Sequence, residues 1–143
     1  ERLLVSRVAE NRRILSNIVS AMEGEFSGGF AEQVAELRVR LEALDKTALR
    51  MLSRFDEGQE ISAEPSMLKL KGSQLVQDMD LVLQDIAGYY GLPLDSIIRA
   101  DTPIGSQYSD MSASTMFHHR GFTIAGGTSE IQRNIIARHV LGL

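Results

Sequence analysis

The chain has 143 residues, enough for one domain that buries a single hydrophobic core. Its formal net charge of −4 and pI of about 5.4 exclude the broad basic surface that nucleic-acid-binding proteins present. It has no cysteine, which excludes disulfides and cysteine-ligated metals and fits the reducing cytoplasm, where we expect the protein. No apolar run approaches the roughly 20 residues that span a bilayer, so we expect no membrane partner.

The first segment has the apolar spacing of a helix. Asn11 is the polar exception in this stripe, and the string "GEFSGGF" ends the pattern. The opening "ERLLVSRVAENRR" is charged throughout and lacks an initiator methionine, which predicts no signal peptide and indicates a fragment of a longer protein. The apolar positions are Leu4, Val8, Leu15, Ile18 and Met22.

Two longer helices follow. The first has apolar residues in steps of three and four, which predicts packing against a partner helix at the shallow angle of antiparallel bundles. The next begins after "DEGQEISAEP", with Ser62 as its expected N-cap and Pro65 in its first turn. The stripes are Val34, Leu37, Leu41, Leu44, Ala48, Met51 and Phe55 in the first, and Leu68, Leu75, Met79, Val82 and Ile86 in the second.

Residues 91–127 have weak periodicity and mix Gly, Pro, Ser and Asp, with a short helix around 109–119. A stretch of this length within a compact domain is usually functional or bound to a partner. We find no β alternation along the chain. The sequence therefore predicts an all-α, up-and-down four-helix bundle that forms one domain over residues 1–143.

The last helix is expected to start at Thr128 or Ser129. Ser129 with Gln132 three residues later has the spacing of a capping box, and Gly142 is the expected stop. The expected apolar positions of this helix are Ile131, Ile135, Ile136 and Val140.

A glycine pair, Gly126 and Gly127, precedes this helix. Glycines allow positive φ and the close approach of another molecule to the backbone. The free N–H groups and the positive dipole end of the helix favour a phosphate at the same place. Spacing alone favours the simpler interpretation, a sharp turn into a capped helix that binds nothing.

The string "GGTSEIQRNIIARHVLG" strongly resembles the C-terminal signature of acyl-CoA dehydrogenases, flavoproteins that desaturate acyl-CoA thioesters between Cα and Cβ. The helical pattern upstream is similar to the C-terminal domain of that family. The resemblance implies that Gly126 and Gly127 line the thioester end of the substrate. It also implies that Thr128, Ser129 and Glu130 contact FAD near its ribose and pyrophosphate.

In that family a glutamate usually stands where this chain has Gly126, and it removes the α-proton as the β-hydrogen leaves as hydride. Branches that resemble isovaleryl- and long-chain acyl-CoA dehydrogenases carry Gly or Ala there, and supply the glutamate from the first helix in a "(Leu/Gln)-Glu-Arg-Leu" context. This chain opens "ERLLVSR". The resemblance therefore implies that Glu1 is the base, with Arg2 beside the substrate; the alternative is an ordinary solvated glutamate at a helix start. A glycine at 126 also leaves room for a bulky or branched acyl group.

Two family motifs that hold the FAD of a neighbouring subunit are altered. An Arg-x-x-Phe-Gly motif corresponds to "EGEFSGGF", with Ser27 near the place of the arginine. A Gln-x-x-Gly-Gly-x-Gly loop corresponds to "DIAGYYG", which keeps Gly88 and Gly91 but has Asp85 for the glutamine. Asp85 and Gly88 are candidate cofactor contacts; the alternative for the two glycines is a plain helix C-cap and turn.

Other candidates have simpler interpretations. His118 and His119 are adjacent and unsuited to sharing one metal ion, so no metal site is predicted. Tyr89 and Tyr90 are interpreted as packing at a helix end. The basic residues of the helices are interpreted as solvated faces: Arg12, Arg13, Arg38, Arg40, Lys69 and Lys71.

The resemblance implies further partners: FAD, an acyl-CoA substrate, an electron-transferring flavoprotein as acceptor, and a homo-tetramer built as a dimer of dimers. A hetero-oligomer stays open because of the altered motifs. A second interpretation is a catalytically silent paralogue subunit or a helical oligomerisation module.

Overall fold

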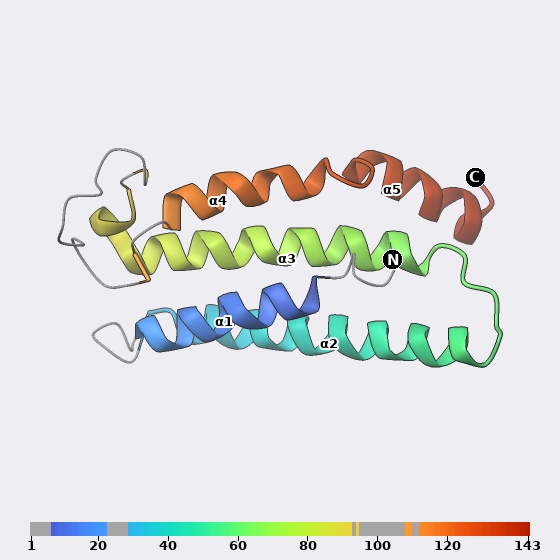
Figure 1. Cartoon of the computed structure of the whole chain (residues 1–143), viewed down its shortest axis with the longest axis horizontal. Coiled ribbons are helices and arrows are strands. Elements are labelled where there is room, and N and C mark those ends of the chain that lie inside the picture. The colour runs from blue at the N-terminus through green and yellow to red at the C-terminus, as the bar shows by residue number, and fades with distance from the viewer. Residues whose placement is uncertain (1–6, 23–28, 93, 95–107, 110–111) are drawn as a thin grey trace.

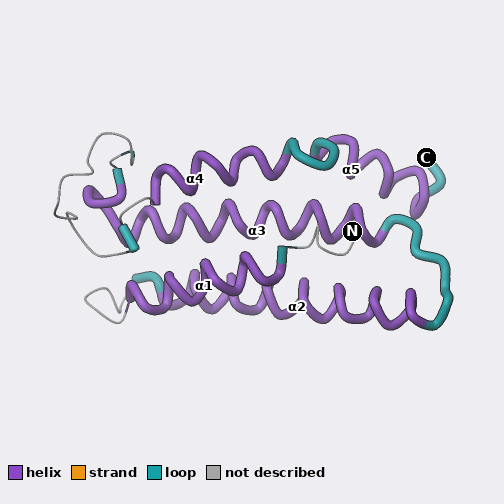
Figure 2. Tube along the Cα trace, in the orientation of Figure 1, coloured by secondary structure: helices purple, strands orange, loops and turns teal. Residues whose placement is uncertain are grey.

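The computed structural model describes residues 7–22, 29–92, 94, 108–109 and 112–143. Within these ranges the chain is helical and contains no strand, as Figure 2 shows. The α-helices are α1 (Val8–Met22), α2 (Ala31–Asp56), α3 (Glu64–Ala87), α4 (Ser112–Arg120) and α5 (Ser129–Ile136). Two short 3-10 helices, η2 (Gly88–Gly91) and η3 (Gly121–Thr123), and a π-helical end, η4 (Ala137–Leu141), complete the described elements.

The helices form an up-and-down bundle with α3 in the middle layer. In Figure 1, α1 and α2 lie on one side of α3, whereas α4 and α5 follow one another along its other side. α3 contacts each of these four helices. Because α4 and α5 together take the place of one long helix, the all-α four-helix bundle expected from the sequence is confirmed.

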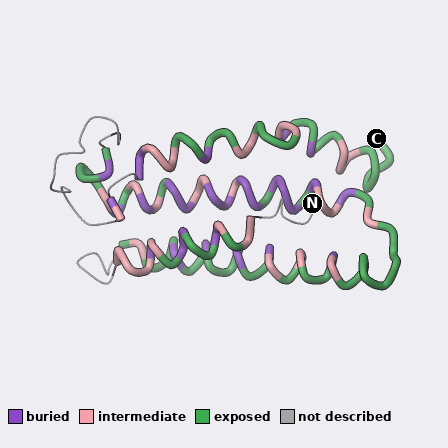
Figure 3. The backbone as a smooth tube through the Cα atoms, in the orientation of Figure 1, coloured by how far each residue is buried: buried purple, intermediate pink, exposed green. Residues whose placement is uncertain are grey.

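The central position of α3 explains why it is buried on more than one face (Figure 3). Leu68, Leu75, Val76 and Met79 supply apolar area to the core, each no more than 2% exposed. Burial of such side chains stabilises the fold by roughly 1.5–3 kcal/mol each. The same helix also buries polar residues that an amphipathic helix would leave in water: Ser66, Lys69, Ser73 and Asp80.

The predicted stripes of α1 and α2 are confirmed where they face α3. Leu15 and Ile18 of α1 are buried, and the buried apolar residues of α2 are Val34, Leu37, Leu41, Leu44 and Met51. Phe55 was expected to continue the α2 stripe, but it is 61% exposed near the helix end, so the prediction is wrong for this residue. Leu4 lies outside the described residues.

The polar exception Asn11 is fully buried between α1 and α3. Its Nδ2 group donates to the carbonyl of Arg7 at 2.9 Å and to that of Gly72 at 3.4 Å. The second bond ties α1 to the middle of α3, where a buried amide needs a partner. Asn11 therefore belongs to the stripe that its spacing predicts.

Two expectations about helix starts and faces are wrong. The N-cap of α3 is Ala63, not Ser62; the backbone N–H of Ser62 instead donates to the Glu64 carboxylate at 2.9 Å. In α5 and η4 the expected apolar stripe is only partly covered: Ile135 and Ile136 are half-buried, whereas Ile131 and Val140 are 51% and 65% exposed. The side chains that α5 buries are those of Ser129 and Gln132. Gly142 ends the last helix in a left-handed conformation, as expected.

None of the helices within the described ranges is long and apolar enough to cross a membrane.

Candidate functional site

The glycine pair lies in the turn that joins η3 to α5. Gly126 has φ +72° and Gly127 has φ +94°, a region that residues with a Cβ rarely adopt. A Cβ at Gly126 would meet nothing within 4 Å, whereas one at Gly127 would lie 2.8 Å from Nε2 of Gln132. A glycine is thus favoured at 126 by its positive φ alone. At 127 it is favoured both by its positive φ and by the nearby side chain of Gln132.

α5 begins with Thr128 as its N-cap. The Thr128 hydroxyl accepts from the backbone N–H of Ile131 at 3.4 Å, so the capping box expected from Ser129 does not form. Gln132 is turned to the glycine pair instead: its Nε2 donates to the carbonyl of Gly126 at 3.0 Å and to that of Gly127 at 3.3 Å. The glutamine expected to cap the helix therefore holds the preceding turn.

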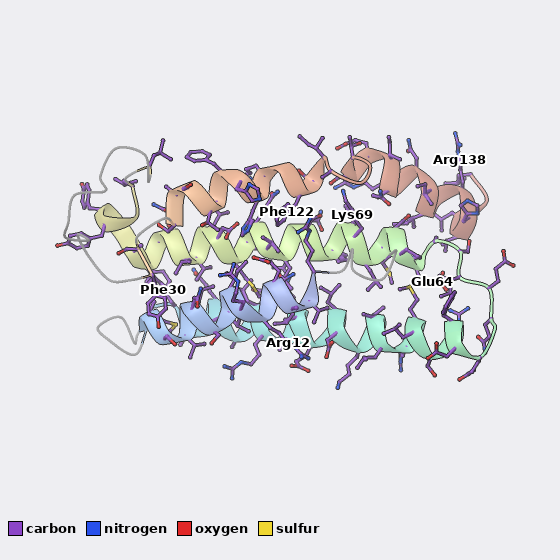
Figure 4. All side chains as sticks on the ribbon, in the orientation of Figure 1. Arg12, Phe30, Glu64, Lys69, Phe122 and Arg138 are labelled. Carbon is purple, nitrogen blue, oxygen red and sulfur yellow. The ribbon has the colours of Figure 1, made fainter. Side chains whose placement is uncertain are left out.

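Lys69 reaches the same turn from α3. It was expected on a solvated face, but only 3% of it is exposed, because α5 and η3 cover it. Its Nζ donates to the carbonyl of Gly127 at 2.6 Å and to that of Thr123 at 3.4 Å. Figure 4 shows Lys69 between α3 and the layer of α4 and α5. Two side chains from different helices therefore hold the carbonyl of Gly127.

These contacts leave the N-terminal end of α5 rich in donors. The N–H groups of Gly127, Thr128 and Ser129 donate to no acceptor within the described part of the chain. Free N–H groups at a helix start, with the positive dipole end, attract anions.

The pKa values of two charged groups, Lys69 and Glu130, are lowered at this site. Desolvation, and then repulsion from Arg7, hold the pKa of Lys69 below its ordinary value, while the charge of Glu130 opposes this. Hydrogen bonds from its own backbone N–H and from Thr128 lower the pKa of Glu130, with further help from Arg133 and Lys69. Hydrogen-bond donors, more than nearby positive charges, therefore favour the ionised form of Glu130.

The start of α1 is tied to the same region. The guanidinium carbon of Arg7 lies 3.3 Å from the ring centroid of Phe122 in η3, a cation–π contact. Arg7 has φ +52°, uncommon for a residue with a side chain, and its carbonyl accepts from Asn11. Glu1 and Arg2, the expected base and its neighbour, lie outside the described residues.

The other candidate contacts lie at the far end of α3. Asp85 is exposed in its last turn, and Gly88 is its C-cap with φ +54°, which agrees with the plain C-cap interpretation. Lys69 and Asp85 are 16 positions apart, about 24 Å along a helix. One chain therefore does not bring Asp85 and Gly88 together with the glycine pair. Ser27 lies outside the described residues.

Gly91 is buried at this far end. A Cβ there would lie 2.7 Å from Oγ of Ser112 and 2.9 Å from Nε2 of Gln84. The Ser112 hydroxyl is 3.0 Å from Oε1 of Gln84 and 3.2 Å from the carbonyl of Gly91. Gly91 is therefore needed where α3 meets the start of α4. Tyr89 and Tyr90 were expected to pack at this helix end, but they are 89% and 56% exposed.

A second buried polar cluster joins α1, α3 and α4. Nδ1 of His119 lies 2.8 Å from Oδ2 of Asp80, and Nε2 of His119 lies 3.7 Å from Oε1 of Glu10. A hydrogen bond from Arg13 lowers the pKa of Glu10, and the charge of His119 adds to this effect. Within the described ranges no group of His, Asp and Glu could hold a metal ion.

The sequence interpretation missed Lys69 and the pairing of Asp80 with His119. A signal for Lys69 exists: it stands between Leu68 and Leu70, both buried, on a helix that has neighbours on opposite sides. The single apolar stripe predicted for α3 left out Lys69, because a central helix buries a wider arc of its surface than an outer one. For Asp80 and His119 no local signal exists, since the partners are 39 residues apart.

Comparisons with known proteins agree with this fold. The family model described as "Acyl-CoA dehydrogenase, C-terminal domain" matches residues 27–141. Two solved structures, the Tcur3481-Tcur3483 steroid ACAD and a variant of it, match with TM-scores of 0.80 and 0.78 and identities of 18% and 19%. Each match covers 100% of this chain and 37% of the other, and at such identities it shows the fold alone. No curated protein sequence matches the chain.

Proposed function

The chain belongs to the acyl-CoA dehydrogenase family and corresponds to the C-terminal domain of that family, and we propose that it takes part in the FAD-dependent desaturation of an acyl-CoA thioester. The chain spans 37% of the length of the structures it matches. We therefore propose that residues 1–143 act with an N-terminal helical domain and a middle β domain, and that they have no turnover alone.

One observation carries the cofactor part of this proposal: the turn at Gly126 and Gly127 has its carbonyls held back by Lys69 and Gln132. The donors left over at the start of α5 suit an anionic group. In the proposal the backbone at Thr128 and Ser129 binds the FAD pyrophosphate, and the Glu130 carboxylate accepts from a ribose hydroxyl. FAD, when bound, supplies the acceptor for the β-hydrogen as hydride.

The base in the proposal is Glu1, because Gly126 has no side chain to remove a proton. A carboxylate suits this step when its surroundings raise its pKa towards the working pH. Arg7 packs on Phe122, next to the turn that leads to the glycine pair. Glu1 is six positions before Arg7, so it lies at most about 20 Å from Arg7 along the chain. Arg2 would lie beside the substrate.

The proposed substrate is an acyl-CoA with a bulky or branched acyl group. A Cβ at Gly126 would meet nothing within 4 Å, so the backbone there leaves open space on the side where the thioester would bind. The name of the matched structures includes a steroid, a bulky polycyclic group, which supports the same direction. A strong preference for short straight chains would contradict this part of the proposal.

We further propose that the protein works as an oligomer, a homo-tetramer in the first instance, and passes its electrons to an electron-transferring flavoprotein. The separation of Asp85 and Gly88 from the glycine pair supports contacts to two different cofactors. Large apolar side chains are exposed on α4, in the turn before α5, on α5 and at the C-terminal end, and in this proposal partner surfaces cover them. They are Phe117, Ile124, Ile131, Val140, Leu141 and Leu143.

The test uses the protein expressed in full. The flavin spectrum is recorded, and acyl-CoAs of different shapes are then added without oxygen to the wild type and to Glu1→Gln. The proposal expects the wild type to lose its FAD absorbance with at least one thioester, and Glu1→Gln to keep both its FAD and its absorbance. Equal bleaching of the two proteins would reject Glu1 as the base.

A catalytically silent paralogue or oligomerisation module remains the second candidate, and Asp85 favours it. An exposed carboxylate at an expected cofactor contact is unfavourable beside a pyrophosphate, although it could accept from a ribose hydroxyl. This candidate predicts a full-length protein that forms the same oligomer, directly or with a partner chain, and carries no flavin. A hetero-oligomer in which the partner supplies the missing contacts would show flavin only after co-expression.

A further inference from the structure

We propose that Lys69 is a positioning residue for the cofactor end of the site. By holding the carbonyl of Gly127 from α3, it directs the N–H of Thr128 towards the bound anionic group. This inference rests on the proposed function for the identity of that group, but its geometric part stands on the contacts of Lys69.

Lys69 fixes the orientation of the peptide plane between Gly127 and Thr128. The C=O and N–H of a trans peptide point in opposite directions within one rigid plane. Lys69 holds the carbonyl of Gly127 at 2.6 Å on the side of α3. The N–H of Thr128, which shares this plane, must therefore point away from α3. In the same way, the bond from Gln132 to the carbonyl of Gly126 turns the N–H of Gly127 outward.

The turn at Gly126 and Gly127 has little rigidity of its own. Successive glycines have the least restricted backbone of any pair, so this turn alone would sample many orientations of its peptide groups. Binding an anion would then require the turn to be ordered at that moment, which weakens affinity. Donors fixed in advance by packed side chains avoid this loss.

Lys69, rather than Gln132 alone, sets the plane of the peptide between Gly127 and Thr128. Hydrogen bonds from a charged donor are stronger than those from an amide, and the Nζ contact to Gly127 is 2.6 Å against 3.3 Å for Gln132. Lys69 also bonds the carbonyl of Thr123, at the end of η3, so it fixes the turn relative to the preceding helix. Its polarisation of the Gly127 carbonyl makes the N–H of Thr128 a better donor.

The experiment compares Lys69→Met, Lys69→Arg and the control Lys71→Met in the protein expressed in full. Lys71 lies two positions further along α3 and is exposed, so its loss removes a charge without touching the turn. Methionine keeps the length of the buried stem but donates no hydrogen bond, whereas arginine keeps the charge and the donors. If Lys69 only fills space, methionine should replace it without loss of FAD affinity. If Lys69 positions the turn, only arginine should preserve that affinity.

The FAD dissociation constant is the main measurement. We expect Lys69→Met to raise it about tenfold or more, as for the loss of a charged hydrogen bond. Lys69→Arg should recover most of the affinity, and Lys71→Met should stay within about threefold of the wild type. Equal affinity of Lys69→Met and Lys71→Met would overturn the proposal. Equal loss in both Lys69 variants, or failure of Lys69→Met to fold, would overturn it too, because Lys69 would then be a general support of the domain.

Backbone hydrogen exchange separates this inference from the proposed function. Lys69→Met should speed exchange of the amides of Ile131 and Gln132, which donate to Thr128 at the end of the turn, and Lys71→Met should not. If the wild type carries no flavin, the proposed function fails, and the exchange data alone decide the role of Lys69. If the wild type bleaches with a thioester while Lys69→Met shows normal affinity and normal exchange, the function stands and the inference fails.

Discussion

Nδ1 of His119 lies 2.8 Å from Oδ2 of Asp80, and each residue is only 3% exposed. In the tautomer with its hydrogen on Nδ1, the imidazole donates to this carboxylate oxygen. The pair joins α4 to α3. A second bond does the same: the backbone carbonyl of His119 in α4 accepts from Nε2 of Gln77 in α3 at 3.3 Å. The packing of α4 therefore depends on polar contacts as well as on Ala113, its one buried apolar residue.

Breaking this pair should be costly, because removal of one partner leaves the other buried and unpaired. We expect Asp80→Ala to lower the free energy of unfolding by about 3–5 kcal/mol. Asp78→Ala is the control. Asp78 lies two positions before Asp80 on α3 and pairs with Arg40 of α2, and the side chains of that pair are 39% (Arg40) and 44% (Asp78) exposed. Its loss should lower the free energy of unfolding by at most about 1 kcal/mol. Denaturant unfolding of the two variants measures the difference, and similar values would contradict a structural role for the pair.

Replacing both members by leucine gives a second test of the same pair. Asp80→Leu combined with His119→Leu removes both buried polar groups, so no unpaired group remains. The double variant should be more stable than Asp80→Ala. A double variant that is less stable would indicate that the pair contributes more than the mutual satisfaction of two polar groups.

The glycines of the turn should differ in their tolerance of alanine. Gly126→Ala pays only for a positive φ, about 1–2 kcal/mol, since its Cβ would meet nothing within 4 Å. Gly127→Ala should cost more, because its Cβ would also lie 2.8 Å from Nε2 of Gln132. Gly121→Ala is the control, with free space and no positive φ, and should be nearly neutral. Thermal unfolding gives the order, and a Gly127→Ala as stable as Gly121→Ala would refute the role of the turn geometry.

A glutamate at position 126 tests the proposed displacement of the base. The open space at Gly126 admits a longer side chain, at the conformational cost of a positive φ. In a Glu1→Gln background, Gly126→Glu should restore flavin bleaching by an acyl-CoA by about tenfold or more, the lower end of what a positioned general base supplies. Gly126→Gln in the same background is the matched control and should restore nothing. Equal rates for the two would show that position 126 does not face the reacting carbon.

The depressed pKa of Lys69 predicts a pH dependence of stability. Desolvation and Arg7 lower this pKa from its ordinary value of 10.5. Between the lowered value and 10.5 the unfolded chain binds more protons than the folded one, so stability attributable to Lys69 rises with pH in this window and is constant below it. The difference in unfolding free energy between wild type and Lys69→Met should therefore increase as pH approaches 10.5. A constant difference over pH 7–10.5 would contradict this.

The sequence predicted the helices well where they bury one face. The steps of three and four in α2 identify Leu37, Leu41 and Leu44, which are buried, because the position of a residue around a helix depends only on local spacing. Spacing failed at Phe55 and Val140, which lie where no described neighbour covers the helix. Burial needs a partner, and periodicity does not reveal where the partner ends.

The glycine pair before a capped helix was also evident from the sequence, because positive φ and an N-cap are local requirements. The cap itself moved by one residue, from Ser129 to Thr128. Only the tertiary structure decided that Lys69 is buried against Gly127 and that Asp80 meets His119, since these contacts join residues 58 and 39 positions apart. The local sequence sets the shape of each helix and turn, and the packing of α3 between two layers determines which of its polar side chains are used.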